Sequence, residues 1–228
     1  MSMVMIAAIA FVGTHFLLSH PLRAPIVARV GEKGFLGLYS LVAFATIGWM
    51  AHAYRNDIET TMLWPVGVGL WALGSVVMLV AAILLMGSLI GNPAMPDPDG
   101  RIAVPAEAKG VFAITRHPML WAFALWGGAH ILVYPVEKNI IVAVAIIILS
   151  LVGAALQDRK KERLKPEQWR RWESMTSYWP LAAIAQGRAR FGRFGMHTLA
   201  GGVVLWLVAT WAHIPLAGWA AGIWRWIG

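Results

Sequence analysis

The chain has 228 residues, of which 59% are hydrophobic and only 13% are charged, with 19 Lys and Arg against 11 Asp and Glu. Soluble domains contain about 25% charged residues, so a lipid environment is expected, and no polar segment is large enough to display the positive charge to a nucleic acid. The absence of cysteine excludes disulfides, thiolate metal sites and cysteine nucleophiles, which leaves histidine and the carboxylates for chemistry or metal binding.

Six apolar stretches are each long enough to cross a bilayer, which takes about twenty residues of helix. They cover residues 3–20, 35–54, 65–90, 118–135, 139–157 and 196–214. The first stretch lacks a basic leading segment and a small-residue cleavage signal, so we expect a retained helix rather than a signal peptide. The predicted fold class is an all-α polytopic transmembrane helix bundle that forms a single domain over residues 1–228.

The last fourteen residues, 215–228, are too short to cross the bilayer. They carry Trp219, Trp224, Arg225 and Trp226, and aromatic and basic side chains gather at the membrane–water interface. We therefore expect a short interfacial C-terminal helix.

Lys and Arg are distributed unequally between the two ends of the six stretches. If the first, third and fifth loops lie on one side, that side holds sixteen of them, and the other side holds Arg55, Lys138 and Arg225. Because cytoplasmic loops retain positive charge, both termini are predicted to face the periplasm of a bacterial inner membrane. The long loop 92–110 would then be cytoplasmic. Residues 158–172 are interpreted as a polar continuation of the fifth helix that meets anionic headgroups, with a nucleic-acid arm as the rival interpretation.

Seven histidines can be sorted by their depth in this topology. His20, His117 and His197 fall at cytoplasmic helix ends, His52, His130 and His213 in the outer parts of helices, and His15 nearer the middle. Ionisable residues inside a bilayer are costly, so a functional role is the default hypothesis. The alternative for any one of them is a hydrogen bond between helices.

The predicted helix from residue 118 contains two features. Arg116 and His117 precede Pro118 and would present donors at a helix N-terminus, a place suited to anions, unless Arg116 extends to lipid headgroups. His130 follows Phe123, Trp126 and Gly127 on one face, a combination that could pack against a flat ring. An ordinary helix interface made of glycine and aromatic residues is the alternative. His117 and His130 cannot share a metal, because about 20 Å of helix separates them.

Four segments of the chain resemble the NnrU family of membrane proteins, which is linked to nitrite and nitric oxide metabolism in denitrifying bacteria. They are HFLLSHPLRAPIVARVGEKGFLGLYSLV from His15, GNPAMP from Gly91, GVFAITRHPMLWAFALWGGAH ending at His130, and TSYWPLAAIAQGR over residues 176–188. The family is related to 15-cis-zeta-carotene isomerase, a membrane enzyme that is similar in its Arg-His-Pro segment and in a histidine thirteen residues further on.

This resemblance implies a b-type haem (iron) held by two histidines, one in the first helix and one at the position of His130. His15 is preferred to His20 because its spacing to Arg23 better matches the isomerase. Upright helices would place His15 and His130 at depths that differ by about 10 Å, so His130 with His213 is kept as the substitute pair. Arg116, His117, Phe123 and Trp126 are the expected cofactor-binding residues, and catalytic residues stay unassigned.

Four functions stay open at this point, and whether the protein is an enzyme is open with them. The first is a haem-b protein of nitrite, nitric oxide or respiratory redox metabolism, with other membrane redox or denitrification proteins as partners. The second is a carotenoid or polyene cis–trans isomerase acting on a hydrophobic substrate. The third is a membrane S-adenosylmethionine-dependent methyltransferase, since some of these enzymes also carry Arg-His-Pro. In those enzymes a pair of carboxylates usually follows the motif's helix, whereas this chain has only the scattered Glu162, Glu167 and Glu173 in that region. The fourth is a structural subunit of a membrane complex.

Overall fold

A computed structural model describes residues 1–97 and 102–227. Their regular structure is α-helical, which confirms the predicted fold class. The helices are α1 (Met3–Ser19), α2 (Arg23–Asn56), α3 (Val68–Ser88), α4 (Val111–Ile114), α5 (Pro118–Val133), α6 (Glu137–Leu164), α7 (Pro166–Met175), α8 (Ala182–Ala185), α9 (Met196–Ala217) and α10 (Trp224–Ile227). Arg101, one of the basic residues counted in the long loop, lies outside the described residues.

Six of these helices correspond to the six predicted membrane spans. α2, α3, α6 and α9 are long and apolar enough to cross a membrane, and α1 and α5 are apolar helices of 17 and 16 residues. Large apolar side chains stay exposed on the outside of the bundle, for example Leu41 and Phe44 at 67% and 75%. Exposed apolar surface on this scale is unfavourable in water and favourable in lipid, which supports a multi-pass membrane protein.

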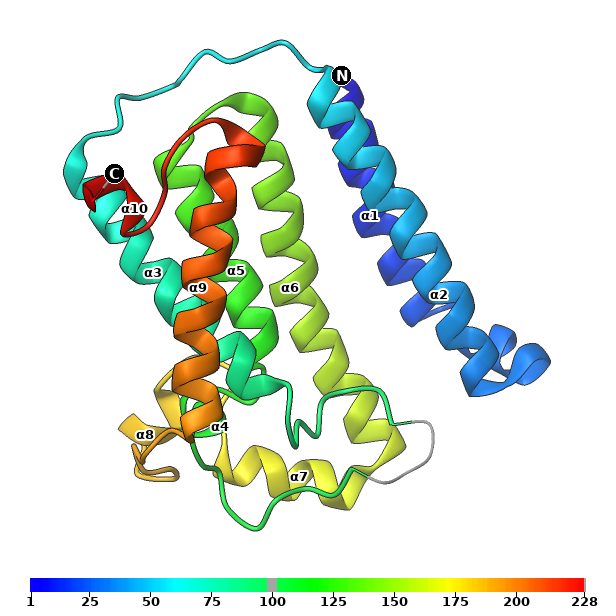
Figure 1. Ribbon diagram of the computed structural model, residues 1–228. Helices are drawn as coiled ribbons and strands as arrows, with labels where there is room; N and C mark the ends of the chain where they lie inside the picture. The colour runs from blue at the N-terminus through cyan, green and yellow to red at the C-terminus, as the bar shows by residue number, and fades with distance from the viewer. Residues whose placement is uncertain (98–101, 228) are drawn as a thin grey trace.

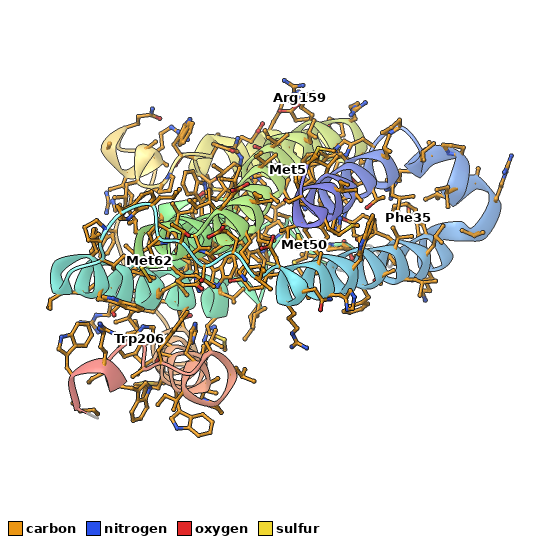
Figure 2. The ribbon with its side chains drawn as sticks, turned by 90° about the horizontal axis from the view of Figure 1, so that it is seen from above. Met5, Phe35, Met50, Met62, Arg159 and Trp206 are labelled. Atoms are coloured by element: carbon orange, nitrogen blue, oxygen red, sulfur yellow. The ribbon has the colours of Figure 1, made fainter. Side chains whose placement is uncertain are left out.

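The helices form a row rather than a closed ring (Figures 1 and 2). α2 packs on α1, α1 on α6, α6 on α5, α5 on α3 and α3 on α9. Both chain ends lie at one end of the bundle, which we call the outer end, and α7 lies across the opposite, inner end. A chain that crosses a membrane an even number of times has both of its ends on the same side. Which end faces the periplasm stays a prediction from the distribution of basic residues.

Glycines allow the closest helix contacts in this row. A Cβ on Gly127 of α5 would lie 2.9 Å from the Ala143 carbonyl oxygen of α6, and one on Gly202 of α9 would lie 2.8 Å from Ile83 Cα of α3. Small residues at such crossings let two backbones approach, and the resulting van der Waals packing favours helix association in lipid. Gly127 therefore belongs to the α5–α6 interface and not to a ring-binding face with His130.

Two predicted boundaries are wrong for reasons that the backbone explains. α2 begins at Arg23, twelve residues before the predicted span, and is kinked at Gly31, whose φ of 72° a glycine adopts without strain. Residues 158–172 do not continue one helix, because α6 ends at Leu164 and α7 begins at Pro166 in a new direction. Proline has no N–H to continue the helix and disfavours a helical conformation at the residue before it.

The C-terminal segment folds back onto the bundle. α9 continues to Ala217, and the expected C-terminal helix is the single turn α10. The Trp224 indole donates to the Leu207 carbonyl at 3.1 Å, and the Arg225 guanidinium lies 4.3 Å from the centre of the Trp71 ring. The segment therefore covers the outer ends of α3 and α9.

Candidate functional site

A cavity of about 350 Å³ lies toward the outer end, between α3, α5, α9 and the C-terminal segment. We call it the outer cavity. Its wall combines aromatic side chains with small ones, including Ala81, Ala82, Ala122, Ala129 and Ala209. Trp206 holds α9 to α3 beside it, because its indole donates to the Ser75 carbonyl at 3.1 Å (Figure 2). Cofactor and small-molecule sites are commonly apolar cavities of about 300–1,000 Å³ with a few polar groups.

His130 and His213 supply two imidazole rings to this cavity. His130 is on α5 and His213 is on α9, and their ring centres lie 6.1 Å apart with an angle of 30° between the ring planes. Each ring is oriented by its own helix, since Nδ1 donates at 2.8 Å to a main-chain carbonyl four residues earlier, Trp126 for His130 and Ala209 for His213.

These two hydrogen bonds determine the tautomer of each ring. A carbonyl only accepts, so Nδ1 carries the proton and Nε2 carries the lone pair in the neutral form. Histidines that bind metals are usually held in this way, with the second ring nitrogen bonded to a carbonyl or carboxylate. Asn139 of α6 adds support, because its side-chain amide donates to the His130 carbonyl at 2.9 Å and the Tyr134 carbonyl at 2.7 Å.

Two other predicted cofactor-binding residues line the outer cavity. The centres of the Trp126 and His130 rings lie 4.2 Å apart, and Phe123 lies one turn before Trp126 on the same helix. Their spacing from His130 along the helix, four residues for Trp126 and seven for Phe123, places all three on one face.

His15 lies in a second cavity of about 400 Å³ toward the inner end, between α1, α2, α5 and α6. We call it the inner cavity. His15 Nδ1 donates to the Phe11 carbonyl at 2.6 Å, and the centre of the His15 ring lies 5.3 Å from the centre of the Tyr39 ring. The outer cavity contains His130 and His213 but not His15, and Phe123 lines both cavities. Of the two predicted pairs, the structure brings the substitute pair together in one cavity and not the preferred one.

Arg116 and His117 are held by Asp158, a residue that the sequence analysis did not identify. Arg116 donates to Asp158 Oδ2 from Nε at 2.9 Å and from Nη2 at 2.7 Å, and His117 Nε2 lies 2.7 Å from Asp158 Oδ1. The Arg116 side chain is 13% exposed, Asp158 9% and His117 0%. We call these three residues the charge cluster. Its donors are directed to a carboxylate within the protein rather than to lipid headgroups. An acidic residue directly after an apolar run was the available signal, but nothing in the sequence indicates its partner.

The loop after α7 closes the charge cluster from the inner end. The Arg116 main-chain N–H donates to the Ser177 carbonyl at 2.8 Å, and the Trp121 indole donates to the Tyr178 carbonyl at 2.9 Å. Glu173 lies 3.3 Å from Arg116. Burial raises the pKa of the Glu173 carboxyl, and the Arg116 charge opposes that rise. Glu173, one of the three glutamates weighed for a methyltransferase, thus forms an ion pair with Arg116 of the charge cluster.

The remaining histidines have local partners. His52 Nε2 lies 3.0 Å from the Asn56 side-chain amide on the exposed face of α2, and His197 Nε2 lies 3.2 Å from Thr198 Oγ1 at the start of α9. Among the described residues, no three His, Asp or Glu side chains converge as a metal site. A haem iron needs only two protein ligands, and the outer cavity contains two histidines.

The family model described as NnrU protein matches residues 3–221. No curated protein and no solved structure matches the chain.

Proposed function

The chain belongs to the NnrU family, and we propose that it is a membrane haem protein whose b-type haem is held in the outer cavity by His130 and His213. One observation carries this proposal: the two rings lie 6.1 Å apart, and the hydrogen bonds of both Nδ1 atoms leave both Nε2 lone pairs for a metal. With bonds of about 2 Å, two imidazoles at this separation could both reach one metal ion.

The surroundings of the two rings support the same assignment. Aromatic side chains such as Trp126 and Trp206 could lie against the porphyrin, and the alanines of the wall leave room for it. A haem with two histidine ligands supplies a one-electron carrier whose potential depends on burial and on hydrogen bonds to the ligands. In the proposed site, the residues of this chain would hold and orient that group.

The physiological setting that we propose is nitrite or nitric oxide metabolism, or respiratory redox work, and the family resemblance supports it. With both histidines bound, iron has no open position. Nitric oxide would therefore bind only where one ligand leaves. Anaerobic addition of nitric oxide to the reduced protein should change the absorption spectrum if the haem senses or processes that gas, whereas an unchanged spectrum would favour electron transfer.

The test of the haem site is an absorption spectrum of the full chain, expressed in haem-replete cells and purified in detergent. We expect a low-spin spectrum that His130→Ala and His213→Ala each abolish or convert to high spin. His52→Ala is the matched control, since His52 lies on the exposed face of α2, and it should leave the spectrum unchanged.

His15→Ala decides between the two predicted ligand pairs. We expect it to keep the low-spin spectrum, because His15 lies in the inner cavity. Loss of the spectrum in His15→Ala together with its retention in His213→Ala would restore the pair preferred from the sequence. A colourless preparation would refute haem binding altogether.

A further inference from the structure

The wall of the inner cavity changes in polarity along the direction of the helices. Toward the middle of the bundle it includes the apolar Phe11, Ile47 and Ile146, whereas at the inner end it carries the polar side chains of Gln157 and Lys160. We infer that this cavity binds one acyl chain of an anionic phospholipid, with the headgroup phosphate beside the Lys160 ammonium. This inference goes beyond the haem proposed for the outer cavity and does not depend on it.

The cavity is long enough to take an acyl chain. Its wall extends on α1 from Phe11 to His20 and on α6 from Ile146 to Lys160, and the stretch of α6 covers about 20 Å of helix. The hydrocarbon region of one leaflet is about 15 Å deep, half of the bilayer core. The cavity therefore follows the helices over about the depth of one leaflet, which is the direction and length of a lipid chain.

Lys160 offers a positive charge that no acceptor in the described residues satisfies. The residue is half-buried, and its ammonium forms no hydrogen bond or ion pair there. The fold encloses His117 Nδ1 and His20 Nε2 completely, but the ammonium keeps accessible surface and can be reached. Glu32 lies within electrostatic range, but its two oxygens accept from Arg23 Nη2 at 2.6 and 2.7 Å. A partly desolvated cation without a counter-ion favours an anionic ligand.

The charges around the inner end of the cavity favour a phosphate over a neutral headgroup. No Asp or Glu of the described residues lines the cavity. Arg163 follows Lys160 by about one turn of α6 and is exposed, and both cations lie within electrostatic range of His20 in the wall. Basic groups between helices at the membrane surface attract anionic lipid headgroups, and the oxygens of one phosphate can accept from more than one cation.

A free fatty acid has similar chemistry, because it also joins a chain to an anionic group. The place of the polar end favours the phospholipid. Lys160 lies in the last turns of α6, which ends at Leu164, and α1 ends at Ser19 beside the cavity. A phosphate at this level would lie among the headgroups of its leaflet, so the second acyl chain of the same lipid could stay in the bilayer.

Native mass spectrometry of the full chain, released from detergent micelles, tests the site with defined lipids. The probes are phosphatidylglycerol, which is anionic, phosphatidylcholine with the same two acyl chains, which has no net charge, and oleate, a free fatty acid. We expect one phosphatidylglycerol molecule to be retained and to bind about fivefold more tightly than phosphatidylcholine, the effect of one cation near an anionic headgroup.

Two variants, each with a matched control, test the two ends of the site. Lys160→Gln should weaken phosphatidylglycerol binding about fivefold, whereas Arg159→Gln removes the same charge outside the cavity wall and should leave binding unchanged. Gly153→Leu should abolish binding, because it adds a side chain to the cavity wall, where a new Cβ would meet nothing closer than Phe16 at 4.0 Å. Gly128→Leu is its control, since Gly128 has open space around it and lines neither cavity.

Each outcome bears on one part of the inference. Equal affinity for phosphatidylcholine, or equal binding by Lys160→Gln and Arg159→Gln, would refute the contact between phosphate and ammonium. Equal binding by Gly153→Leu and Gly128→Leu would refute the acyl chain in the cavity. Displacement of phosphatidylglycerol by an equal concentration of oleate would overturn the phospholipid in favour of a fatty acid. If Gly153→Leu does not fold, the comparison of lipids and Lys160→Gln still decide.

Discussion

Loss of the Asp158 carboxylate should destabilise the protein more than any nearby change of charge. Asp158 accepts three hydrogen bonds of 2.7 to 2.9 Å from Arg116 and His117, and all three side chains are largely buried. Removal of one partner from a buried ion pair costs about 3–5 kcal/mol, because the remaining charge is left without compensation. We expect a loss of about this size in the free energy of unfolding of Asp158→Ala.

The matched control lies one residue away. Arg159 is exposed and points away from the bundle in Figure 2, so Arg159→Ala should change the free energy of unfolding by less than about 0.5 kcal/mol. Both variants can be measured by unfolding in mixed detergent micelles with increasing SDS, followed by tryptophan fluorescence.

A double variant tests the physical reason for the loss. Arg116→Leu with Asp158→Leu removes both charges, so no unpaired charge stays buried, and it should be less destabilised than Asp158→Ala. If Asp158→Ala loses no more stability than Arg159→Ala, the charge cluster is not the buried ion pair described here. If the double variant is the least stable of the three, the loss comes from packing and not from an uncompensated charge.

Two further predictions concern the packing of the helices and their orientation. Gly127→Leu should destabilise the bundle by about 1–3 kcal/mol through overpacking against α6, whereas the neighbouring Gly128→Leu has open space and should be neutral in the same SDS assay. Equal losses in both would contradict the α5–α6 contact. Because the chain has no cysteine, single cysteines can report topology: in intact cells a membrane-impermeant maleimide should label Thr60→Cys, and it should label Arg190→Cys only after permeabilisation. The reverse pattern would invert the orientation predicted from basic residues.

The fold was predictable from sequence because lipid imposes a simple requirement on it. Backbone polar groups in a bilayer must be satisfied within the helix, so each long apolar run becomes one crossing. The predicted and observed bounds differ little for α1, α3, α5 and α9. They differ at Arg23, where a segment with polar residues adds helix before the apolar run, and at Pro166, where a proline begins a new helix. Hydrophobicity predicts neither boundary.

The candidate site was predictable within one helix but not between helices. The helical repeat places Phe123, Trp126 and His130 on one face of α5, and the structure confirms that they line one cavity. The repeat did not distinguish this face from the one that carries Gly127, which packs against α6. Nothing in the local sequence indicates that Asp158, on another helix, is the partner of Arg116.

The sequence by itself therefore predicted an all-α membrane bundle of six apolar segments, which agrees with the six apolar helices of the structure, and it placed histidines within those segments. Only the tertiary structure decided which histidines meet. α9 packs on α3 and brings His213 to His130, while α1 packs on α6 and places His15 in the inner cavity. The physical reason is that a membrane crossing depends on the composition of one segment, whereas a site depends on which helix faces pack together. Close contacts at residues such as Gly127 and Gly202 determine that packing.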